Sequence, residues 1–332
     1  MLRVPRVRVI HPETVGEAVK VLEAEDGARV LGGGTDLLVA LKYGLGTAGP
    51  LVAVGRLGID AVEPDGAGWR IGGAATLWDL ERWEPQGAFR AVVEAASLVG
   101  APPIRSRATA AGNLCLDTRC FFYNQSAFWR SGRPPCRKAG GGVCHVVPRG
   151  DRCHACHQSD LAPALLAAGA QVEVAGPAGS RAVPVEALYS GDGRAPLTLQ
   201  AGELVTGIRL PESGPGVGSA YEKLRMRRGL DFPAAAAAVR LARGGDGRCA
   251  EARVVLGAVA SGPVRVPEAE QALVGSRLEA GALAAAAEAA RRAARPVKNT
   301  DLTPGYRRDV VGALVERAAR RAWARANGGG QP

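Results

Sequence analysis

The chain has 332 residues, of which 47% are hydrophobic and 22% charged, so an intrinsically disordered protein is excluded and a soluble globular protein of about two domains is indicated. Its formal net charge of +10 first indicates a polyanionic partner such as a nucleic acid. Seven cysteines are too few for a disulfide scaffold of this length, but five of them fall between Cys120 and Cys156, a clustering typical of metal or redox chemistry.

The N-terminal residues 1–6 are charged and lack the apolar core of a signal peptide. No uncharged apolar run approaches the roughly 20 residues that a membrane helix requires. We therefore expect a cytoplasmic protein that makes no membrane contact and keeps its thiols reduced. Disulfides are then a poor explanation for the cysteines.

Two segments carry the positive charge. Basic residues exceed acidic ones by six in residues 119–157 and by seven in residues 291–325, whereas the rest of the chain is slightly acidic. Neither segment has the interleaved aromatics or the motif spacing of a nucleic-acid binder, so no nucleic-acid partner is expected. The C-terminal basic residues lie on alanine-rich helical patterns and are interpreted as a solvated face or a subunit contact.

The first predicted elements lead into a glycine-rich loop. A helix capped by Thr14 precedes a strand at 29–31, which runs into Gly32, Gly33 and Gly34. Glycines allow positive φ and close backbone approach, and Thr35 can cap the next helix. This arrangement is typical of a phosphate-binding loop.

The remaining pattern predicts a mixed α+β fold in two domains. A second loop is expected at 107–114, and the Gly-, Pro- and Ser-rich residues 211–218 are expected to form the linker between the domains. The other expected elements are strands at 51–54, 69–72, 171–175, 219–224, 234–241 and 252–259, and helices at 76–83, 88–99, 161–168, 267–273, 278–294 and 306–326.

The cysteine-rich segment has no hydrophobic periodicity and is expected to be a long functional insertion. Four thiolates on this basic segment could hold an anionic [4Fe-4S] cluster, whose charge the basic residues would offset. A structural zinc site is the main rival, because histidines intersperse the cysteines and Cys153 and Cys156 form a C-x2-C step. Unligated thiols are the third interpretation.

The glycine loop does not match a Rossmann fingerprint, because Leu37 occupies the place of the third glycine. Two separate loops, at 32–34 and around Gly112, could instead clasp one extended dinucleotide. Taken alone, each loop is better interpreted as an ordinary tight turn.

Both loops resemble the FAD-binding loops of the flavin subunits of molybdenum hydroxylases, the xanthine dehydrogenase and CO dehydrogenase family. The similar segments span essentially the whole chain: 31–37, 109–114, 159–165, 203–205, 221–223 and 306–308. The resemblance implies a two-lobed FAD-binding domain of the PCMH, vanillyl-alcohol oxidase-like, type over residues 1–217. A smaller C-terminal α+β domain, like that of CO dehydrogenase flavoproteins, would follow over residues 218–332.

The resemblance also implies the residues that bind FAD. The two loops would wrap the pyrophosphate and ribityl groups, Asp160 would take a sugar hydroxyl, and Lys223 would lie near the isoalloxazine. Val99 and Val205 would contact the ring system. Apart from the resemblance, Asp160 and Lys223 would be interpreted as a helix cap and a surface lysine. Ala111 stands where the family usually has glycine. The implied residues are Val30, Leu31, Gly32, Gly33, Gly34, Thr35, Asp36, Leu37, Val99, Thr109, Ala110, Ala111, Gly112, Asn113, Asp160, Val205 and Lys223.

The insertion, at about 115–158, is similar to that of the β subunits of 4-hydroxybenzoyl-CoA reductases in the segments 117–120, 122–126, 129–130 and 144–146. This resemblance implies a [4Fe-4S] cluster. Its ligands would be Cys120, Cys136, Cys144 and Cys153. Cys156 would be a spare thiol, although its closeness to Cys153 leaves a ligand exchange open. Cys115 and Cys249 are expected to be ordinary small apolar residues.

The resemblance thus implies an electron-transfer subunit that has no catalytic residues of its own. Reduced ferredoxin would supply electrons through [4Fe-4S] and FAD to a [2Fe-2S] subunit and a molybdenum-cofactor subunit, where 4-hydroxybenzoyl-CoA is reduced to benzoyl-CoA. The complex would be a dimer of heterotrimers. The alternatives are the flavin subunit of an aldehyde or heterocycle molybdenum hydroxylase, with the opposite electron flow, and a zinc-stabilised basic binding module.

Overall fold

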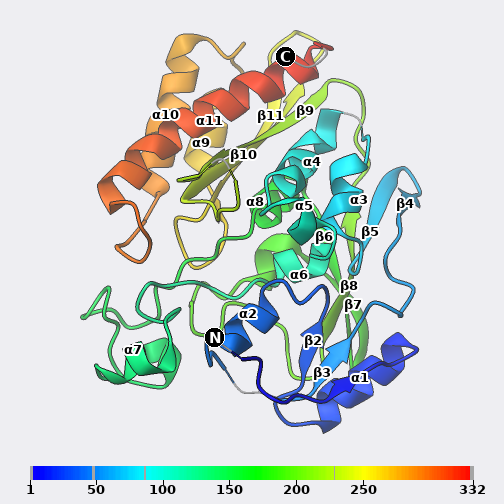
Figure 1. Ribbon diagram of the computed structural model, residues 1–332. Helices are drawn as coiled ribbons and strands as arrows, with labels where there is room; N and C mark the ends of the chain where they lie inside the picture. Colours follow the sequence, from blue (N-terminus) through cyan, green and yellow to red (C-terminus); the bar gives the residue numbers. More distant parts are fainter. Residues whose placement is uncertain (1–2, 47–48, 86, 228, 330–332) are drawn as a thin grey trace.

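A computed structural model describes residues 3–46, 49–85, 87–227 and 229–329. Within these residues the strands form three separate sheets. The first sheet lies at the bottom of Figure 1, and the third lies at the top beside the C-terminal helices. No helix in the described ranges combines the length and the apolar character needed to cross a membrane.

The first sheet is small and parallel. In spatial order it consists of β1 (Val9–Ile10), β3 (Leu51–Ala53) and β2 (Arg29–Leu31), connected through α1 (Val15–Ala24) and α2 (Leu37–Lys42). The side chain of Thr14 accepts a hydrogen bond from the Glu17 N–H at 3.1 Å, as the capping pattern predicts. The start of α2 differs from the prediction that Thr35 caps it. The N-cap residue is Asp36, and its side chain forms no cap bond.

The second sheet is antiparallel and forms the other lobe of the N-terminal part. Its spatial order is β4 (Val62–Asp65), β5 (Gly68–Gly72), β8 (Leu204–Leu210), β6 (Gln171–Gly176) and β7 (Gly179–Pro184). Its helices and 3-10 turns are α3 (Leu77–Arg82), η1 (Gly87–Phe89), α4 (Arg90–Ser97), α5 (Pro102–Arg105), α6 (Ala110–Leu114), α8 (Leu161–Ala168) and η3 (Val185–Leu188). The segment expected to be a loop at 107–114 therefore contains a short helix, α6.

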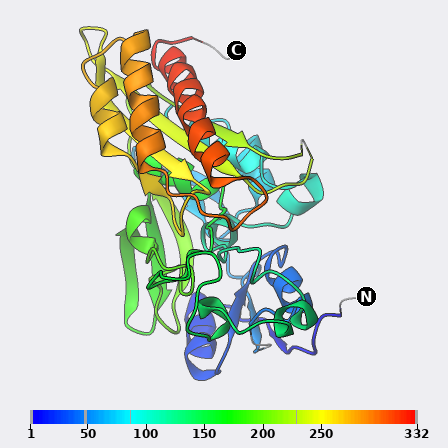
Figure 2. The same ribbon diagram turned by 90° about the vertical axis from the view of Figure 1, so that its left-hand side faces the viewer.

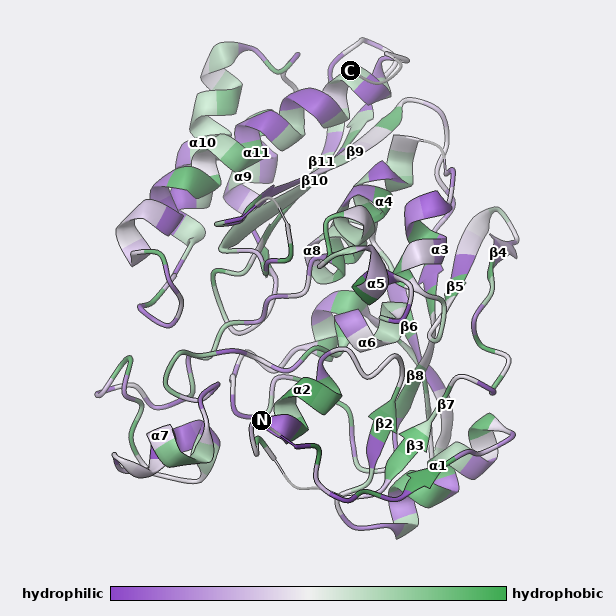
Figure 3. Ribbon diagram, viewed as in Figure 1, coloured by the Kyte–Doolittle hydropathy of each residue, from purple (hydrophilic) through white to green (hydrophobic). Residues whose placement is uncertain are grey.

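The third sheet lies between two layers of helices. Its strands are β12 (Val264–Arg265), β11 (Cys249–Gly257), β10 (Ala235–Arg243) and β9 (Val217–Leu224), in that spatial order. The helices α9 (Pro267–Leu273), α10 (Ala280–Ala293) and α11 (Pro304–Ala326) lie side by side on one face in Figure 2, while α4 and α8 pack on the other. Figure 3 shows alternating hydrophilic and hydrophobic bands along α11, as expected of a helix with one face on a sheet.

The alanine-rich strand β10 makes this sandwich possible. Ala236 and Ala238 belong to the core shared with α4 and α8, whereas Ala235 and Ala237 belong to the core under α11. Neighbouring strand residues point to opposite faces, and the small side chains let helices approach closely on both sides.

The insertion leaves the N-terminal part after α6 and returns before α8. It contains α7 (Ala127–Ser131) and η2 (Arg137–Ala139), and it projects to the side of the molecule around α7 in Figure 1. At its base, the backbones of Arg119 and Cys156 form two mutual hydrogen bonds of 2.7 Å. The insertion is thus closed at its stem.

Some C-terminal basic residues have a role that the sequence interpretation missed. Arg321 and Arg325 of α11 both bind the carboxylate of Glu94 in α4, which also accepts the Tyr221 N–H at 2.8 Å. These arginines therefore join the two parts of the chain, instead of forming only a solvated face or a subunit contact.

We expect Glu94→Gln to lower the free energy of unfolding by about 2 kcal/mol, because the buried Arg325 loses its carboxylate partner and Arg321 keeps only that of Glu222. Chemical denaturation of the full chain measures the change. The matched control is Glu316→Gln, which removes a largely exposed ion pair with Arg320 and should cost well under about 1 kcal/mol. Equal losses in both variants would contradict the joining role of Glu94.

Candidate cofactor-binding sites

The two glycine-containing loops that were expected to clasp one dinucleotide lie against each other. A Cβ atom added to Gly33 would overlap the carbonyl oxygen of Arg107, and one added to Gly32 would lie 2.7 Å from the Thr109 hydroxyl. Gly34 has a φ of +71°, in the left-handed region. Glycine is thus required at Gly33 for the packing of the first loop on the backbone of the second, and at Gly34 for the left-handed backbone.

The second loop is held by its own side chains. The Thr109 hydroxyl accepts the Gly112 N–H at 3.1 Å and begins α6. The amide oxygen of the buried Asn113 accepts hydrogen bonds from the Ser159 hydroxyl at 2.8 Å and the Leu161 N–H at 3.1 Å, so it ties α6 to the start of α8. The N–H of Ala111 donates to the Gly73 carbonyl at 3.0 Å, and the alanine is accommodated where the family usually has glycine.

Asp160 and Lys223 form one buried ion pair. Their charged atoms are 3.0 Å apart, and the Tyr221 hydroxyl donates to Asp160 at 2.7 Å. Lys223 also donates to the carbonyls of Leu98 at 2.9 Å and Asp231 at 3.1 Å. Burial raises the pKa of Asp160, and the lysine opposes this shift. Asp160 is the N-cap residue of α8, as the alternative interpretation expected, but its side chain makes no cap bond, and the Ser159 hydroxyl accepts the Ala162 N–H at 3.0 Å instead. The surface lysine of that interpretation is absent, because the Lys223 side chain is buried.

The valines expected to bind FAD, two at the flavin ring and Val30 in the first loop, lie at different depths. Val205 is buried in β8, and its carbonyl lies close to Gly73. The carbonyl of Gly73 accepts the N–H of Ala111 in the second loop. Val99 is partly buried against the same core, whereas Val30 is exposed in β2. The structure therefore brings Val205 together with the second loop.

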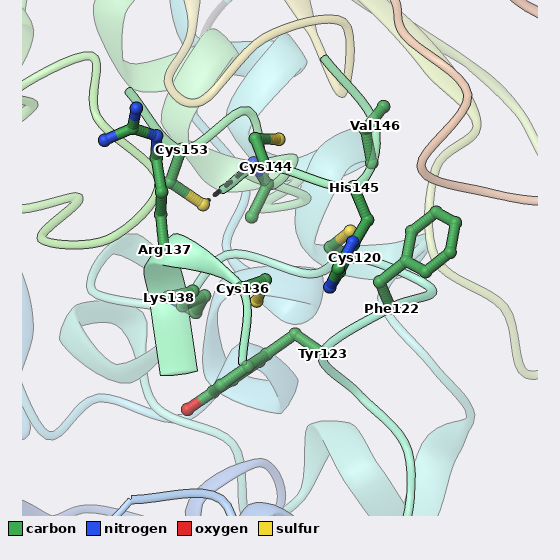
Figure 4. Close-up of a pocket in the computed structure, with 11 residues that line it drawn as sticks. Cys120, Phe122, Tyr123, Cys136, Arg137, Lys138, Cys144, His145, Val146 and Cys153 are labelled. Atoms are coloured by element: carbon green, nitrogen blue, oxygen red, sulfur yellow. Dashed lines mark hydrogen bonds between the residues drawn. The ribbon is translucent and has the colours of Figure 1, made fainter. Parts of the chain in front are cut away.

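The insertion forms a second candidate site. The side chains of four cysteines line one small cavity, together with Phe122, Tyr123, Arg137, Lys138, His145, Val146 and Ala155. Figure 4 shows the four sulfur atoms around a common space. The cysteines are Cys120, Cys136, Cys144 and Cys153, the four that the sequence interpretation selected. Burial, reinforced by the other three thiols, raises the pKa of Cys120 to about 12.

Polar groups of the insertion are arranged around these sulfurs. Backbone N–H groups lie 3.4 Å from the Cys144 sulfur and 3.5 Å from the Cys153 sulfur. The buried Lys138 ammonium lines the cavity and donates to Asp117 at 2.7 Å and to the Gly193 carbonyl at 2.6 Å. N–H donors and a nearby cation both stabilise negative charge on thiolate ligands.

The other thiols lie outside this cavity. The buried Cys156 sulfur faces the Arg307 guanidinium at 3.7 Å, and burial raises its pKa to about 11. Cys249 packs in the core of the third sheet, and Cys115 packs against the core of the second lobe. In the ranges that the structure describes, no group of three His, Cys, Asp or Glu side chains could hold a metal ion. A four-iron cluster differs from a single ion because each iron needs only one cysteine, so its ligands need not converge on a point.

Comparison with known proteins covers nearly the whole chain. Residues 5–213 match the family described as the FAD binding domain in molybdopterin dehydrogenase, and residues 219–322 match the CO dehydrogenase flavoprotein C-terminal domain. The aldehyde oxidoreductase FAD-binding subunit PaoB of Escherichia coli (strain K12) is 33% identical over 280 residues, which cover 78% of this chain and 83% of the relative.

Two CO dehydrogenase comparisons extend further. The carbon monoxide dehydrogenase medium chain of Afipia carboxidovorans is 30% identical over 320 residues, which cover 95% of this chain and 96% of that one. The crystal structure of the cyanide-inactivated Cu,Mo-CO dehydrogenase superposes with a TM-score of 0.79 at 28% identity, covering 97% of this chain and 100% of the other. The mixed fold with an FAD-binding domain and a CO dehydrogenase flavoprotein-like C-terminal domain is thereby confirmed.

We expect Gly33→Ala to abolish FAD binding, because the added Cβ would push the first loop away from Arg107 of the second. Bound flavin per chain, measured by absorbance after gel filtration, reports the loss. Gly281→Ala is the matched control, since it adds the same methyl group where no atom lies within 4 Å. Full flavin content in Gly33→Ala would show that the packing of the two loops does not determine FAD binding.

Proposed function

Because the chain belongs to the FAD-binding subunits of the xanthine dehydrogenase and CO dehydrogenase family of molybdenum hydroxylases, we propose that it is an electron-transfer subunit with two cofactors of its own, FAD and a [4Fe-4S] cluster. When bound, the cluster exchanges single electrons and the flavin exchanges one or two, so together they connect donors and acceptors of different kinds. The observation that carries the proposal is the common cavity of four cysteines in an FAD-binding chain.

For FAD, we assign the pyrophosphate and ribityl groups to the packed loops at 30–37 and 109–113. The ion pair of Asp160 and Lys223 lies at the junction of the second lobe and the third sheet, and we assign its neighbourhood to the sugar and the isoalloxazine, with Val99 and Val205 at the ring. We place the domain boundary between residues 217 and 218.

For the cluster, the surroundings of the cavity perform three tasks. Lys138 and Arg137 offset negative charge, backbone N–H groups bond to two of the sulfurs, and Phe122 and Val146 help to exclude water. Leu45, just after α2, packs with Cys120 and Cys153 in one apolar cluster, so the cavity lies directly against the lobe that carries the first glycine loop.

We further propose that the whole complex is a 4-hydroxybenzoyl-CoA reductase-like enzyme. The similarity of the insertion at 117–120, 122–126 and 129–130 supports this choice. The partners would be a molybdenum-cofactor subunit and a [2Fe-2S] subunit in a dimer of heterotrimers, with ferredoxin as the donor. The substrate would bind on the partner subunit that carries the molybdenum cofactor.

A second candidate is the flavin subunit of an aldehyde or heterocycle oxidoreductase. The 33% identical relative, which is a subunit of an aldehyde oxidoreductase, favours it. The reconstituted complex distinguishes the two: reduction of 4-hydroxybenzoyl-CoA by a low-potential donor supports the reductase, whereas oxidation of aldehydes by an artificial acceptor supports the second candidate. The matches to flavin subunits leave no support for a zinc-stabilised binding module.

The full chain purified without oxygen should contain FAD and about four iron atoms. Its visible spectrum should combine flavin bands with broad iron-sulfur absorption, and metal analysis should find iron in place of zinc. A protein with flavin but stoichiometric zinc would contradict the cluster. A protein with neither flavin nor iron would refute the whole proposal.

We expect Cys136→Ser to remove the iron and leave FAD bound, since this cysteine lines the cavity and lies outside the two FAD loops. Iron, acid-labile sulfide and flavin per chain are measured together. Cys156→Ser is the matched control and should retain iron, because its sulfur faces Arg307. Loss of iron in the control, combined with retention in Cys136→Ser, would overturn the ligand assignment.

A further inference from the structure

Arg119 lies on the short stretch of chain between the two candidate sites. It directly precedes Cys120, and its backbone is fixed by the two hydrogen bonds with Cys156. The Cys120 N–H is held in turn by the Asn124 side chain at 2.8 Å. Neighbouring residues of an extended segment point to opposite sides, so Cys120 lines the cysteine cavity while Arg119 points elsewhere.

The guanidinium of Arg119 reaches the first glycine loop. It donates a hydrogen bond to Asp36, the last residue before α2, and forms an ion pair with it across 83 positions of sequence. On its other side it lies 4.2 Å from the centre of the Phe232 ring. Phe232 follows Asp231, whose carbonyl binds Lys223. One side chain of the insertion therefore contacts both the loop assigned to the FAD pyrophosphate and the segment beside Lys223.

This cation still has an unused donor. The Nε atom of Arg119 is buried and has no hydrogen-bond partner among the described residues. Burial lowers the pKa of Arg119 to about 10, so the side chain is still charged at neutral pH. A buried donor without a partner is destabilising by about 1–3 kcal/mol, and such groups in native proteins require an explanation.

We propose that Arg119 is a positioning residue of the FAD site: it holds the first glycine loop through Asp36 and offers its remaining N–H groups to the anionic FAD. This inference rests on the proposed function, since it needs FAD at the loops, but it does not need the cluster. The insertion then supplies a cation to the flavin site as well as ligands to the cysteine cavity.

The experiment is a titration of the flavin-free full chain with FAD, followed by fluorescence at several salt concentrations. Arg119→Gln should weaken FAD binding on the order of tenfold or more and make the affinity less dependent on salt. Arg119→Lys keeps the charge, so it should restore the salt dependence and much of the affinity. The iron content of each variant is measured in parallel.

Two controls separate this role from others. Arg133→Gln removes the same charge at 3.9 Å from the Trp129 ring, on the exposed side of the insertion, and should leave FAD affinity unchanged. Iron content should be the same in all variants, because the backbone bonds of Arg119 and Cys120 are unaffected.

The outcomes distinguish the inference from the proposed function. Unchanged affinity and salt dependence in Arg119→Gln would overturn the inference, as would an equal loss in Arg133→Gln or in Arg119→Lys. A wild-type chain that binds FAD but contains no iron would instead overturn the cluster, while a weaker and less salt-dependent Arg119→Gln would still support the inference.

Discussion

The insertion depends on one buried guanidinium, that of Arg307 in the first turn of α11. This side chain is fully buried and has no carboxylate partner in the described part of the chain, an arrangement that is costly unless its N–H donors are all bonded. Neutral acceptors from three regions meet this requirement. They are the carbonyls of Ala234, Ala258 and Val297, the Asn299 side chain and the Cys156 sulfur.

Asn299 extends this network to both ends of the insertion. Its side-chain amide donates to the His154 carbonyl at 2.7 Å, and its own carbonyl accepts the Phe121 N–H at 2.9 Å. Phe121, which follows Cys120, and His154, which follows Cys153, are thus tied to the C-terminal domain. On the opposite side, Arg119 ties the same stem to the first glycine loop. The cysteine cavity is therefore held by both domains, although the insertion has few regular elements of its own.

Features that depend on local sequence could be predicted, whereas those that depend on distant contacts could not. The capped helix after Thr14 and the glycine loop follow from neighbouring residues, because caps and left-handed backbone are set within a few positions. The helix α6 was missed because its five residues are too few to show periodicity. The pairing of Asp160 with Lys223 spans 63 positions, and no local pattern records it.

The four cavity cysteines could be selected by resemblance, but spacing alone did not separate Cys153 from Cys156. In the structure, the backbone of Cys156 pairs with Arg119 and its sulfur faces Arg307, so Cys156 lies outside the cavity that Cys153 lines.

The positive charge that first indicated a polyanion has a structural explanation. Arg307 joins the insertion to the C-terminal domain, Arg325 joins α11 to α4, Arg119 joins the insertion to the first glycine loop, and Lys138 lies at the cysteine cavity. These cations sit where separate segments meet, and each is bonded to carbonyls or carboxylates of another segment. In the proposed subunit the two cofactors need a constant separation, which contacts of this kind would maintain better than a flexible loop. The basic residues of the insertion thus fix the cysteine cavity relative to the first glycine loop, and they would also offset the negative charge of the proposed cluster.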